Sequence, residues 1–161
     1  MVYTATDYQL IKQALACAKT IAMVGVSFIK KNESPNNIRR RPSIIVMKYL
    51  QEFNYRVIPV NPSAEGKKIN GEIVVGKLED IKIPIDLVNV FRPSTEAPML
   101  AEQAIRIGAK VLWLQYGIQN KQAEKISKSA NIAYIANKCI KQEYQRLFLK
   151  VNPVFPVLQT D

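Results

Sequence analysis

A phosphate-binding turn is the first chemistry that the sequence offers. The apolar run at residues 21–24 leads directly into Gly25, Val26 and Ser27. An apolar run of this length bounded by a turn predicts a buried strand. Glycine then lets the backbone bend and approach a ligand without a Cβ in the way, and the amides that follow can face an anion. We therefore expect Gly25, Val26 and Ser27 to hold a phosphate group.

Polar or small residues also follow four later apolar runs, at the point where each predicted strand ends. The carboxyl ends of parallel strands meet at one edge of a sheet, and ligands of such sheets bind there. Among these residues, Arg92 can bind a phosphate with two hydrogen bonds, and Phe91 or Tyr116 can pack against an adenine ring or an acyl chain. The residues in question are Asn61 and Pro62, Phe91 and Arg92, Gln115 and Gly117, and Asn137 and Cys139. Together they favour a nucleotide site.

The chain contains no histidine, which excludes several kinds of catalysis. A Ser-His-Asp triad, a Cys-His pair and a metal site with imidazole ligands all require this residue. Cys17 and Cys139 are too few for a disulfide scaffold or for a zinc site built from cysteines. Acid–base chemistry would have to use carboxylates, lysine, tyrosine or cysteine, and the acidic residues make no obvious carboxylate pair. The simplest interpretation is binding without catalysis.

The formal net charge of +10 predicts attraction to anions without saying which anions. Nucleic acid, anionic lipid and phosphorylated cofactors all qualify. Many lysines are scattered along the chain, as on an ordinary solvated surface. Denser basic groups occur at 30–31, 39–41 and 67–68, the first two of them between the first predicted strand and the next predicted helix. No recognised reading helix or aromatic-basic motif supports a nucleic-acid binder.

The size and composition are those of one soluble globular domain. The chain has 161 residues, of which 48% are hydrophobic and 22% charged. No apolar run approaches the roughly 18 residues that span a bilayer, and the N-terminus lacks the zones of a signal peptide. We therefore expect a single cytoplasmic domain over residues 1–161. Its apolar C-terminal tail, residues 151–161, is expected to cover a sheet edge or to cross to a partner subunit in a homodimer.

Hydrophobic periodicity predicts strands and helices in alternation. Proline or a capping residue marks the start of three helices, at Pro42, Ser94 and Asn120. Strands are expected at 21–24, 56–60, 73–75 (a short edge strand), 86–91, 110–115 and 132–136, and helices at 6–18, 42–53, 94–108, 120–130 and 140–150. This alternation predicts an α/β fold with a parallel sheet, right-handed crossovers and helices on both faces.

The usual fingerprint of a nicotinamide-dinucleotide site is missing. Such a site normally shows G-x-G-x-x-G after the first strand and an acidic residue at the end of the second strand. Here Gly25 stands alone, and the second position is Asn61. The two sequence features that usually indicate NAD binding are therefore both missing.

Six sequence blocks carry a resemblance that covers nearly the whole chain. They are Ile21-Ala-Met-Val-Gly-Val-Ser27, Arg41-Pro-Ser43 with Tyr49-Leu50, Tyr55-Arg-Val-Ile-Pro-Val-Asn-Pro62, Asp86-Leu-Val-Asn-Val-Phe-Arg92, Ile107-Gly-Ala-Lys-Val-Leu-Trp-Leu-Gln115 with Gly117, and Cys139-Ile-Lys141 with Glu143. In this order they resemble the small stand-alone CoA-binding proteins, which are related to the CoA-binding domain of the succinyl-CoA synthetase α subunit. The resemblance implies a Rossmann-like sheet of strand order 3-2-1-4-5-6.

The resemblance also implies where coenzyme A would lie. The turn at 25–27 would hold its phosphate region. The block that contains Arg41 and Ser43 would also contribute cofactor-binding residues. Near the adenosine 3′-phosphate end it implies Asn61, Pro62 and Lys67 or Lys68. Phe91 and Arg92 would flank the middle of the molecule, and Gln115, Gly117 and Cys139 would approach the pantetheine end. Coenzyme A carries about four negative charges near neutral pH, so a basic protein has the complementary charge.

Two departures from the family pattern affect this carry-over. The segment 28–41 is longer than in the family and carries basic residues, as either a lid or a solvated insertion. Tyr144 stands where many relatives have histidine, which argues against proton transfer there. Cys139 has two possible roles. It is either a small buried thiol at a strand–helix junction or a thiol that forms a mixed disulfide with the pantetheine sulfur.

The sequence thus predicts a protein that binds coenzyme A or an acyl-CoA, without a membrane and with nucleic acid as an unfavoured partner. One alternative is an NAD(P)-linked or acyl-CoA ligase-type enzyme component, which would work with a separate catalytic partner. A nonspecific nucleic-acid binder is the third.

Overall fold

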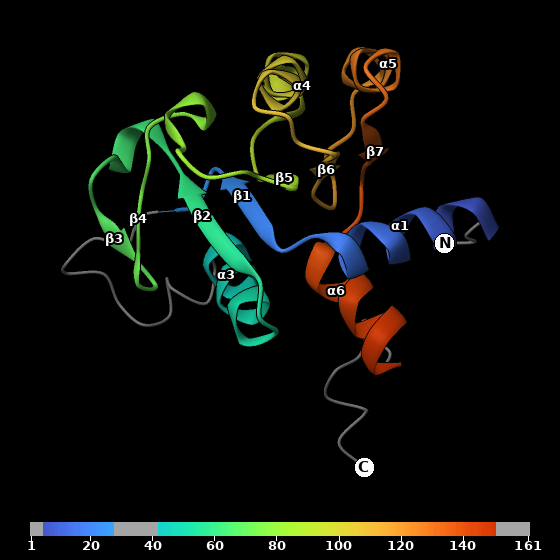
Figure 1. Cartoon of the computed structure of the whole chain (residues 1–161), viewed down its shortest axis with the longest axis horizontal. Helices are drawn as coiled ribbons and strands as arrows, with labels where there is room; N and C mark the ends of the chain where they lie inside the picture. The colour runs from blue at the N-terminus through green and yellow to red at the C-terminus, as the bar shows by residue number, and fades with distance from the viewer. Residues whose placement is uncertain (1–4, 28–41, 151–161) are drawn as a thin grey trace.

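A five-stranded parallel sheet forms the centre of the protein, with helices on both of its faces (Figure 1). The computed structural model describes residues 5–27 and 42–150. The basic segment 28–41, which includes Arg41, and the tail 151–161 lie outside these residues. The strands are β1 (Thr20–Val24), β2 (Arg56–Val60), β5 (Leu87–Val90), β6 (Val111–Leu114) and β7 (Ala133–Ile135). The helices are α1 (Ala5–Cys17), α3 (Pro42–Glu52), α4 (Ala97–Arg106), α5 (Lys121–Ser129) and α6 (Ile140–Tyr144), which a π-helical turn, η4 (Gln145–Leu149), continues.

The strand order across the sheet is β2-β1-β5-β6-β7, and every pair of neighbours is parallel. This arrangement confirms the α/β, Rossmann-like class. The chain adds β2 on one side of β1 and then crosses back to add β5 on the other side. The order therefore reverses between β1 and β5, and a ligand of such a sheet binds beyond the carboxyl ends of these strands.

The sequence-based strand order needs one correction, at the strand expected over 73–75. Five of the six strands take their expected places, but the third is reduced to a single parallel bridge between Val75 and Val60. The preceding residues form an antiparallel hairpin instead, β3 (Lys68–Ile69) with β4 (Glu72–Ile73).

Local chemistry explains this hairpin. Asn70 and Gly71 have φ angles of 48° and 85°, and positive φ at both turn residues is what a type I′ hairpin turn requires. On the neighbouring edge of β2, the Pro59 carbonyl accepts from the Val75 amide, but proline has no N–H with which to extend the ladder.

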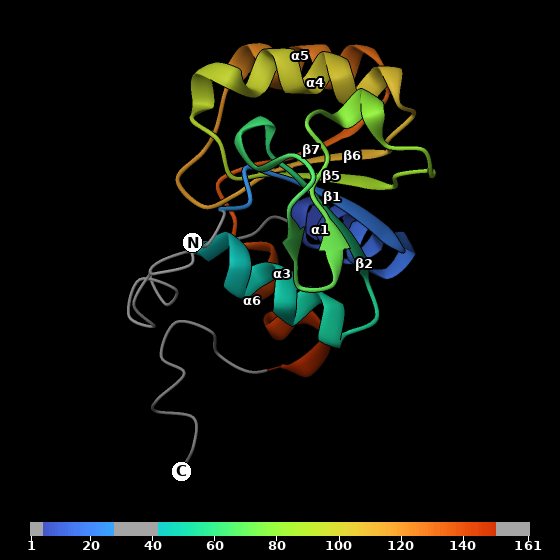
Figure 2. The ribbon, with the colours of Figure 1, turned by 90° about the vertical axis from the view of Figure 1, so that its left-hand side faces the viewer.

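Two hydrophobic layers fix the helices to the sheet. Figure 2 shows α4 and α5 on one side and α1, α3 and α6 on the other. Alternate strand residues face opposite layers: Val24 and Val90 pack with α4, whereas Met23 and Trp113 pack with α1, α3 and α6. Trp113 is fully buried, as its position inside a strand predicts. These layers make the sheet a rigid support for the loops at its carboxyl edge.

Among the described residues, no helix is both long and apolar enough to cross a membrane.

Candidate functional site

The turn after β1 is packed directly against the end of β5. Gly25 has a φ of 93°, in the left-handed region that favours glycine. A Cβ atom there would lie 2.7 Å from the Phe91 carbonyl oxygen and 2.8 Å from Cδ of Arg92. The Gly25 amide donates to the Val60 carbonyl of β2, at 2.8 Å. A glycine at this position thus lets three strand ends meet without a gap.

The two residues after Gly25 are held from either side. The Asn61 side chain donates through Nδ2 to the Val26 carbonyl at 2.9 Å, and the Ser27 amide donates to Oγ of Ser43 at 3.0 Å. Val26 and Ser43 are both buried. These two side chains therefore support the turn from within the protein, and the Ser27 amide is engaged with Ser43.

Asn61 connects two loops of the carboxyl edge. Besides its bond to Val26, its Oδ1 accepts from the Ser63 amide at 2.9 Å and so caps the short turn that begins at Pro62. Both ends of the amide bind backbone groups, which an acidic side chain could not do because it has no donor. This dual role gives a physical reason for asparagine where a dinucleotide-binding protein would have an acid.

A pocket of about 210 Å³ opens beside this turn, between the sheet edge and α4. Gly25, Asn61 and Pro62 line it together with Arg92, as the sequence analysis expects. Apolar side chains such as Val24, Val60 and Leu100 also contribute to the lining. The pocket thus combines an apolar wall with polar and charged groups at the switch point of the sheet, the usual character of a small-molecule site.

Arg92 is paired at the pocket with an acidic residue that the sequence analysis does not single out. Its Nε and Nη2 both donate to Oε2 of Glu96, at 3.0 and 2.7 Å. Glu96 lies four residues further along the chain and lines the same pocket. The spacing is the available signal, because residues four apart meet in a helical turn. Any anion bound by Arg92 must share the guanidinium with this carboxylate.

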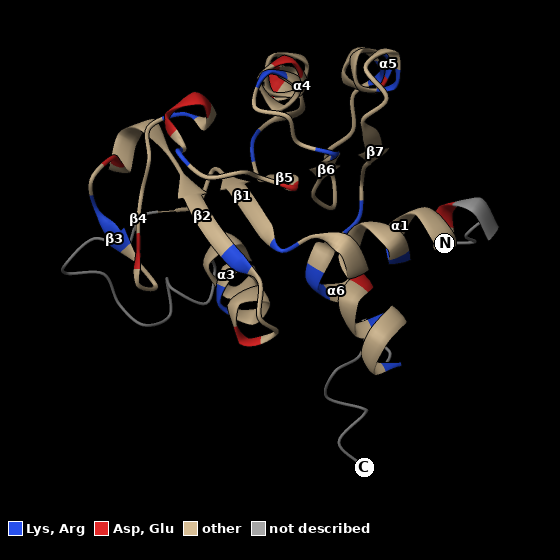
Figure 3. Cartoon of the chain, viewed as in Figure 1, with Lys and Arg blue, Asp and Glu red and all other residues tan. Residues whose placement is uncertain are grey.

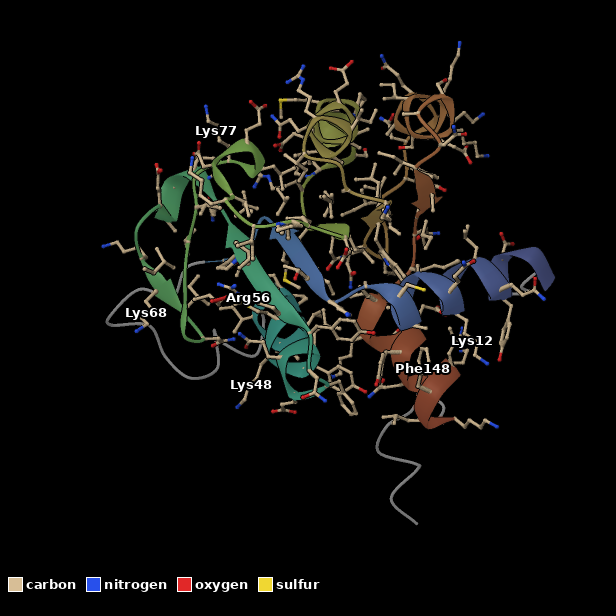
Figure 4. The ribbon with its side chains drawn as sticks, in the orientation of Figure 1. Lys12, Lys48, Arg56, Lys68, Lys77 and Phe148 are labelled. Carbon is tan, nitrogen blue, oxygen red and sulfur yellow. The ribbon has the colours of Figure 1, made fainter. Side chains whose placement is uncertain are left out.

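Among the described residues, Lys77 is the lysine that lines this pocket, whereas Lys67, the residue expected from the sequence, is not part of the lining. Lys77 follows the Val75 bridge to β2, which brings it back to the sheet edge. Figure 4 labels Lys77 at the same end of the molecule as α4, and Lys68 on the hairpin further away. Lys77 gives no sequence signal of its own, since its place depends on the hairpin that precedes it.

The residues expected at the pantetheine end form a second group, at the ends of β6 and β7. Gln115 is buried, and its Oε1 accepts from Nδ2 of Asn89 and from the Ile140 amide, each at 3.3 Å. The Gly117 amide donates to Oδ1 of Asn137 at 2.8 Å. Cys139 is partly buried and directly precedes α6. The structure therefore brings Gln115, Gly117 and Cys139 to one corner of the carboxyl edge.

Asn89 is a buried polar residue that the sequence analysis does not single out. It lies in the middle of β5, fully buried, and its Nδ2 also donates to the Trp113 carbonyl at 3.4 Å. The sequence feature that could have identified it is an asparagine inside an otherwise apolar strand. Phe91, directly after the same strand, is half-buried and packs on the hydrophobic core.

Other features are less suited to a nucleotide. Three larger pockets, of about 400, 400 and 470 Å³, lie at the outer side of β2, between α1 and the amino ends of β6 and β7, and along α5, away from the switch point. Figure 3 shows lysine and arginine on most elements of the described chain rather than on one face. The pocket at Gly25 and Arg92 is therefore the candidate site.

The comparisons with known proteins agree with this geometry. Residues 19–145 match the model of the CoA binding domain family. The Bacillus subtilis protein YneT is 37% identical over 81% of this chain and 89% of its own length. A solved structure from Thermus thermophilus is 36% identical, with a TM-score of 0.77 over 88% of this chain and 98% of that one.

An ADP-forming acetate–CoA ligase of Methanocaldococcus jannaschii is 27% identical over 83% of this chain. The match spans 18% of the length of that ligase, so this chain corresponds to one part of it. The family match extends from the start of β1 to the end of α6 and includes every described element of the candidate site. This chain belongs to the CoA binding domain family.

Proposed function

We propose that this protein binds coenzyme A or an acyl-CoA at the carboxyl edge of its sheet and has no catalytic activity of its own. The observation that carries the proposal is the pocket at the switch point, where Arg92 and Lys77 lie beside the Gly25 turn in a member of the CoA binding domain family. Two cations beside a close-approach glycine suit a phosphorylated ligand. The second group, around Gln115 and Cys139, lies where a long ligand would extend along the same edge.

The non-catalytic part of the proposal is supported by the chemistry of the chain. Histidine is absent from the whole sequence. Among the described residues, the ionisable groups that line the pocket are Arg92, Lys77 and Glu96, and Arg92 and Glu96 bind each other. We propose that any reaction of the bound CoA takes place on a separate catalytic partner, as in an acyl-CoA ligase assembled from several parts.

Two alternatives have less support. An NAD site would have an acidic residue at the end of β2 to bind the ribose, and an NADP site would have a basic residue there to bind the 2′-phosphate. In this protein the residue is Asn61, and its side-chain amide is already hydrogen-bonded to backbone groups. A nucleic-acid site would gather its basic residues on one face, whereas those of the described chain are spread over most elements (Figure 3). The expected cytoplasmic location and homodimer stay predictions; sedimentation of the full chain tests the dimer.

Calorimetric titration of the full chain tests the proposal. Coenzyme A, dephospho-CoA, NAD, NADP and ATP are titrated in parallel at one salt concentration, because phosphate contacts depend on salt. We expect binding of CoA, with weaker binding of dephospho-CoA and little or none of NAD. Binding of NADP in preference to CoA, or of none of the five, would overturn the proposal and leave the family and the fold unaffected.

A further inference from the structure

The side-chain amide of Gln115 is held in one orientation by backbone groups. The Ile140 amide is a donor and cannot be anything else, so the Gln115 atom that faces it at 3.3 Å must be the oxygen. The Trp113 carbonyl is an acceptor, so the Asn89 atom that faces it must be the nitrogen. That nitrogen also donates to Oε1 of Gln115, at 3.3 Å. Two independent backbone groups thus agree on how both amides are turned.

This orientation decides which atom of Gln115 is left for a ligand. Oε1 has two donors, one from β5 and one from the start of α6. Nε2 has no hydrogen-bond partner among the described residues. Gln115 is only 6% exposed, and flipping the amide would place Nε2 against two donors inside the protein. Because that flip costs two hydrogen bonds, Gln115 offers an N–H donor and cannot offer an acceptor.

Two neighbouring donors at this corner are already occupied. The Gly117 amide donates to Asn137, and Nε1 of Trp113 donates to the Lys138 carbonyl at 2.8 Å. Both bonds hold the loop between β7 and α6 against the end of β6. Gln115 Nε2 is therefore a donor with a fixed direction and no partner among the described residues.

We propose that Gln115 selects a hydrogen-bond acceptor at this end of the ligand, specifically an amide carbonyl oxygen of the pantetheine arm. The inference rests on the proposed CoA binding and adds that the protein donates the hydrogen bond and the ligand accepts it. An arm that covers this donor without giving it an acceptor leaves the donor unpaired, which costs binding free energy. The corner thus favours an arm that places a carbonyl oxygen there, and a nucleotide without the arm makes no contact with it.

The test replaces Gln115 by glutamate, which keeps an oxygen toward Asn89 and Ile140 and exchanges the outer NH2 for a second oxygen. Binding of CoA and of 3′-phosphoadenosine 5′-phosphate, which has no pantetheine arm, is measured at pH 8 for the wild type and for Gln115→Glu. Gln119→Glu, at an exposed position on the following loop, controls for the added charge. We expect Gln115→Glu to weaken CoA binding by about tenfold or more. Binding of the arm-less nucleotide should change by less than about twofold.

Equal weakening of both ligands, or unchanged CoA binding, would overturn the inference. A second measurement does not depend on the folding of a variant: the wild type is titrated with CoA analogues in which each amide carbonyl in turn is replaced by a methylene group. At least one analogue should bind about tenfold more weakly than CoA, and the inference fails if neither does. If the wild type binds no CoA, the proposed function itself has failed, which is a different result from binding without dependence on Gln115.

Discussion

Arg92 and Glu96 are joined through a single oxygen atom at the candidate pocket. Nε and Nη2 of the arginine both donate to Oε2 of the glutamate, at 3.0 and 2.7 Å. The aliphatic part of Arg92 lies over Gly25, where a Cβ would meet its Cδ and Cγ atoms at 2.8 and 3.1 Å. Glycine thus makes room for the arginine, and the carboxylate fixes its guanidinium at the pocket. A bound phosphate would compete with Glu96 for the same cation.

This competition predicts that Glu96→Gln tightens CoA binding. Removing the carboxylate frees the guanidinium and removes a negative charge next to the ligand phosphates. Since the pair is partly exposed, we expect about two- to fivefold tighter binding, and a smaller effect at high salt. The control is Glu102→Gln, at an exposed position of helix α4, which begins directly after Glu96. Weaker binding in Glu96→Gln would mean that the carboxylate contacts the ligand favourably.

Two lysines distinguish the structural site from the one expected from sequence. Lys77 lines the pocket and Lys67 does not. We therefore expect Lys77→Gln to weaken CoA binding by about three- to tenfold, because the variant loses one charge-assisted hydrogen bond to the ligand. Lys67→Gln, which removes the same charge from the hairpin side, should have little effect. Calorimetry on both variants checks this, and the reverse result would place the adenosine end of CoA at the hairpin.

Gly25→Ala should destabilise the protein by more than about 2 kcal/mol, because the new methyl group meets backbone at 2.7 Å in addition to the strain of positive φ. Gly71→Ala is the matched control: its φ is 85°, and a Cβ there meets nothing within 4 Å. It should cost about 1 to 2 kcal/mol, the strain alone. Urea unfolding measures both variants. Equal losses would show that the β1 turn and the end of β5 are not in close contact.

Tyr55 should make the protein lose stability at alkaline pH. Burial, with a further contribution from Tyr144, raises the pKa of Tyr55 above its ordinary value of about 10. Above that pH the unfolded chain releases the phenol proton and the folded chain keeps it. The free energy of unfolding therefore falls as pH rises through this range. Below it, the contribution of Tyr55 is fully present.

The variant Tyr55→Phe tests this directly. It loses the hydrogen bond to the Leu15 carbonyl and should be less stable at pH 8 by about 1 kcal/mol. From pH 9 to 11, however, it should lose less stability than the wild type does. Tyr116→Phe, at a residue that is 72% exposed, should follow the wild-type profile. If Tyr55→Phe also declines in parallel with the wild type, Tyr55 ionises equally in both states.

The two cysteines provide an internal comparison for the pantetheine end of the site. Cys17 is exposed, and Cys139 is partly buried beside Gln115 and α6. We expect iodoacetamide to modify Cys17 faster than Cys139, and saturating CoA to slow the modification of Cys139 without changing that of Cys17. Mass spectrometry of the peptides follows both rates. Undiminished labelling of Cys139 at saturating CoA would remove it from the site.

Much of the fold was predictable because strong local patterns agreed with tertiary packing. The strand ahead of Gly25, the cap of α5 at Asn120 and the buried Trp113 all follow from the residues themselves. The prediction of a strand at 73–75 was wrong for two reasons. The Asn70-Gly71 turn folds the preceding residues into a hairpin, and Pro59 lacks the N–H that would extend the pairing along the edge of β2. Both features are visible in the sequence, but their consequence depends on which strand lies alongside.

The candidate site was predictable in its position and less so in the roles of its residues. Strand ends converge by topology alone, so Gly25, Asn61, Arg92 and Gln115 could be expected at one edge. Which of their atoms are already bonded depends on three-dimensional partners, such as Asn89 for Gln115. Lys77 was not predictable because its place depends on the hairpin that precedes it, and the signal for Glu96 was its spacing of four residues from Arg92.

The most direct test of the account is a map of backbone amide signals by nuclear magnetic resonance as CoA is added to the labelled full chain. The account predicts that the amides of Gly25, Arg92 and Gln115 shift and saturate together, whereas those of Lys110 and Asn131, beside the pocket at the opposite edge of the sheet, do not. Shifts confined to that opposite edge, or no shifts at all at millimolar CoA, would contradict it.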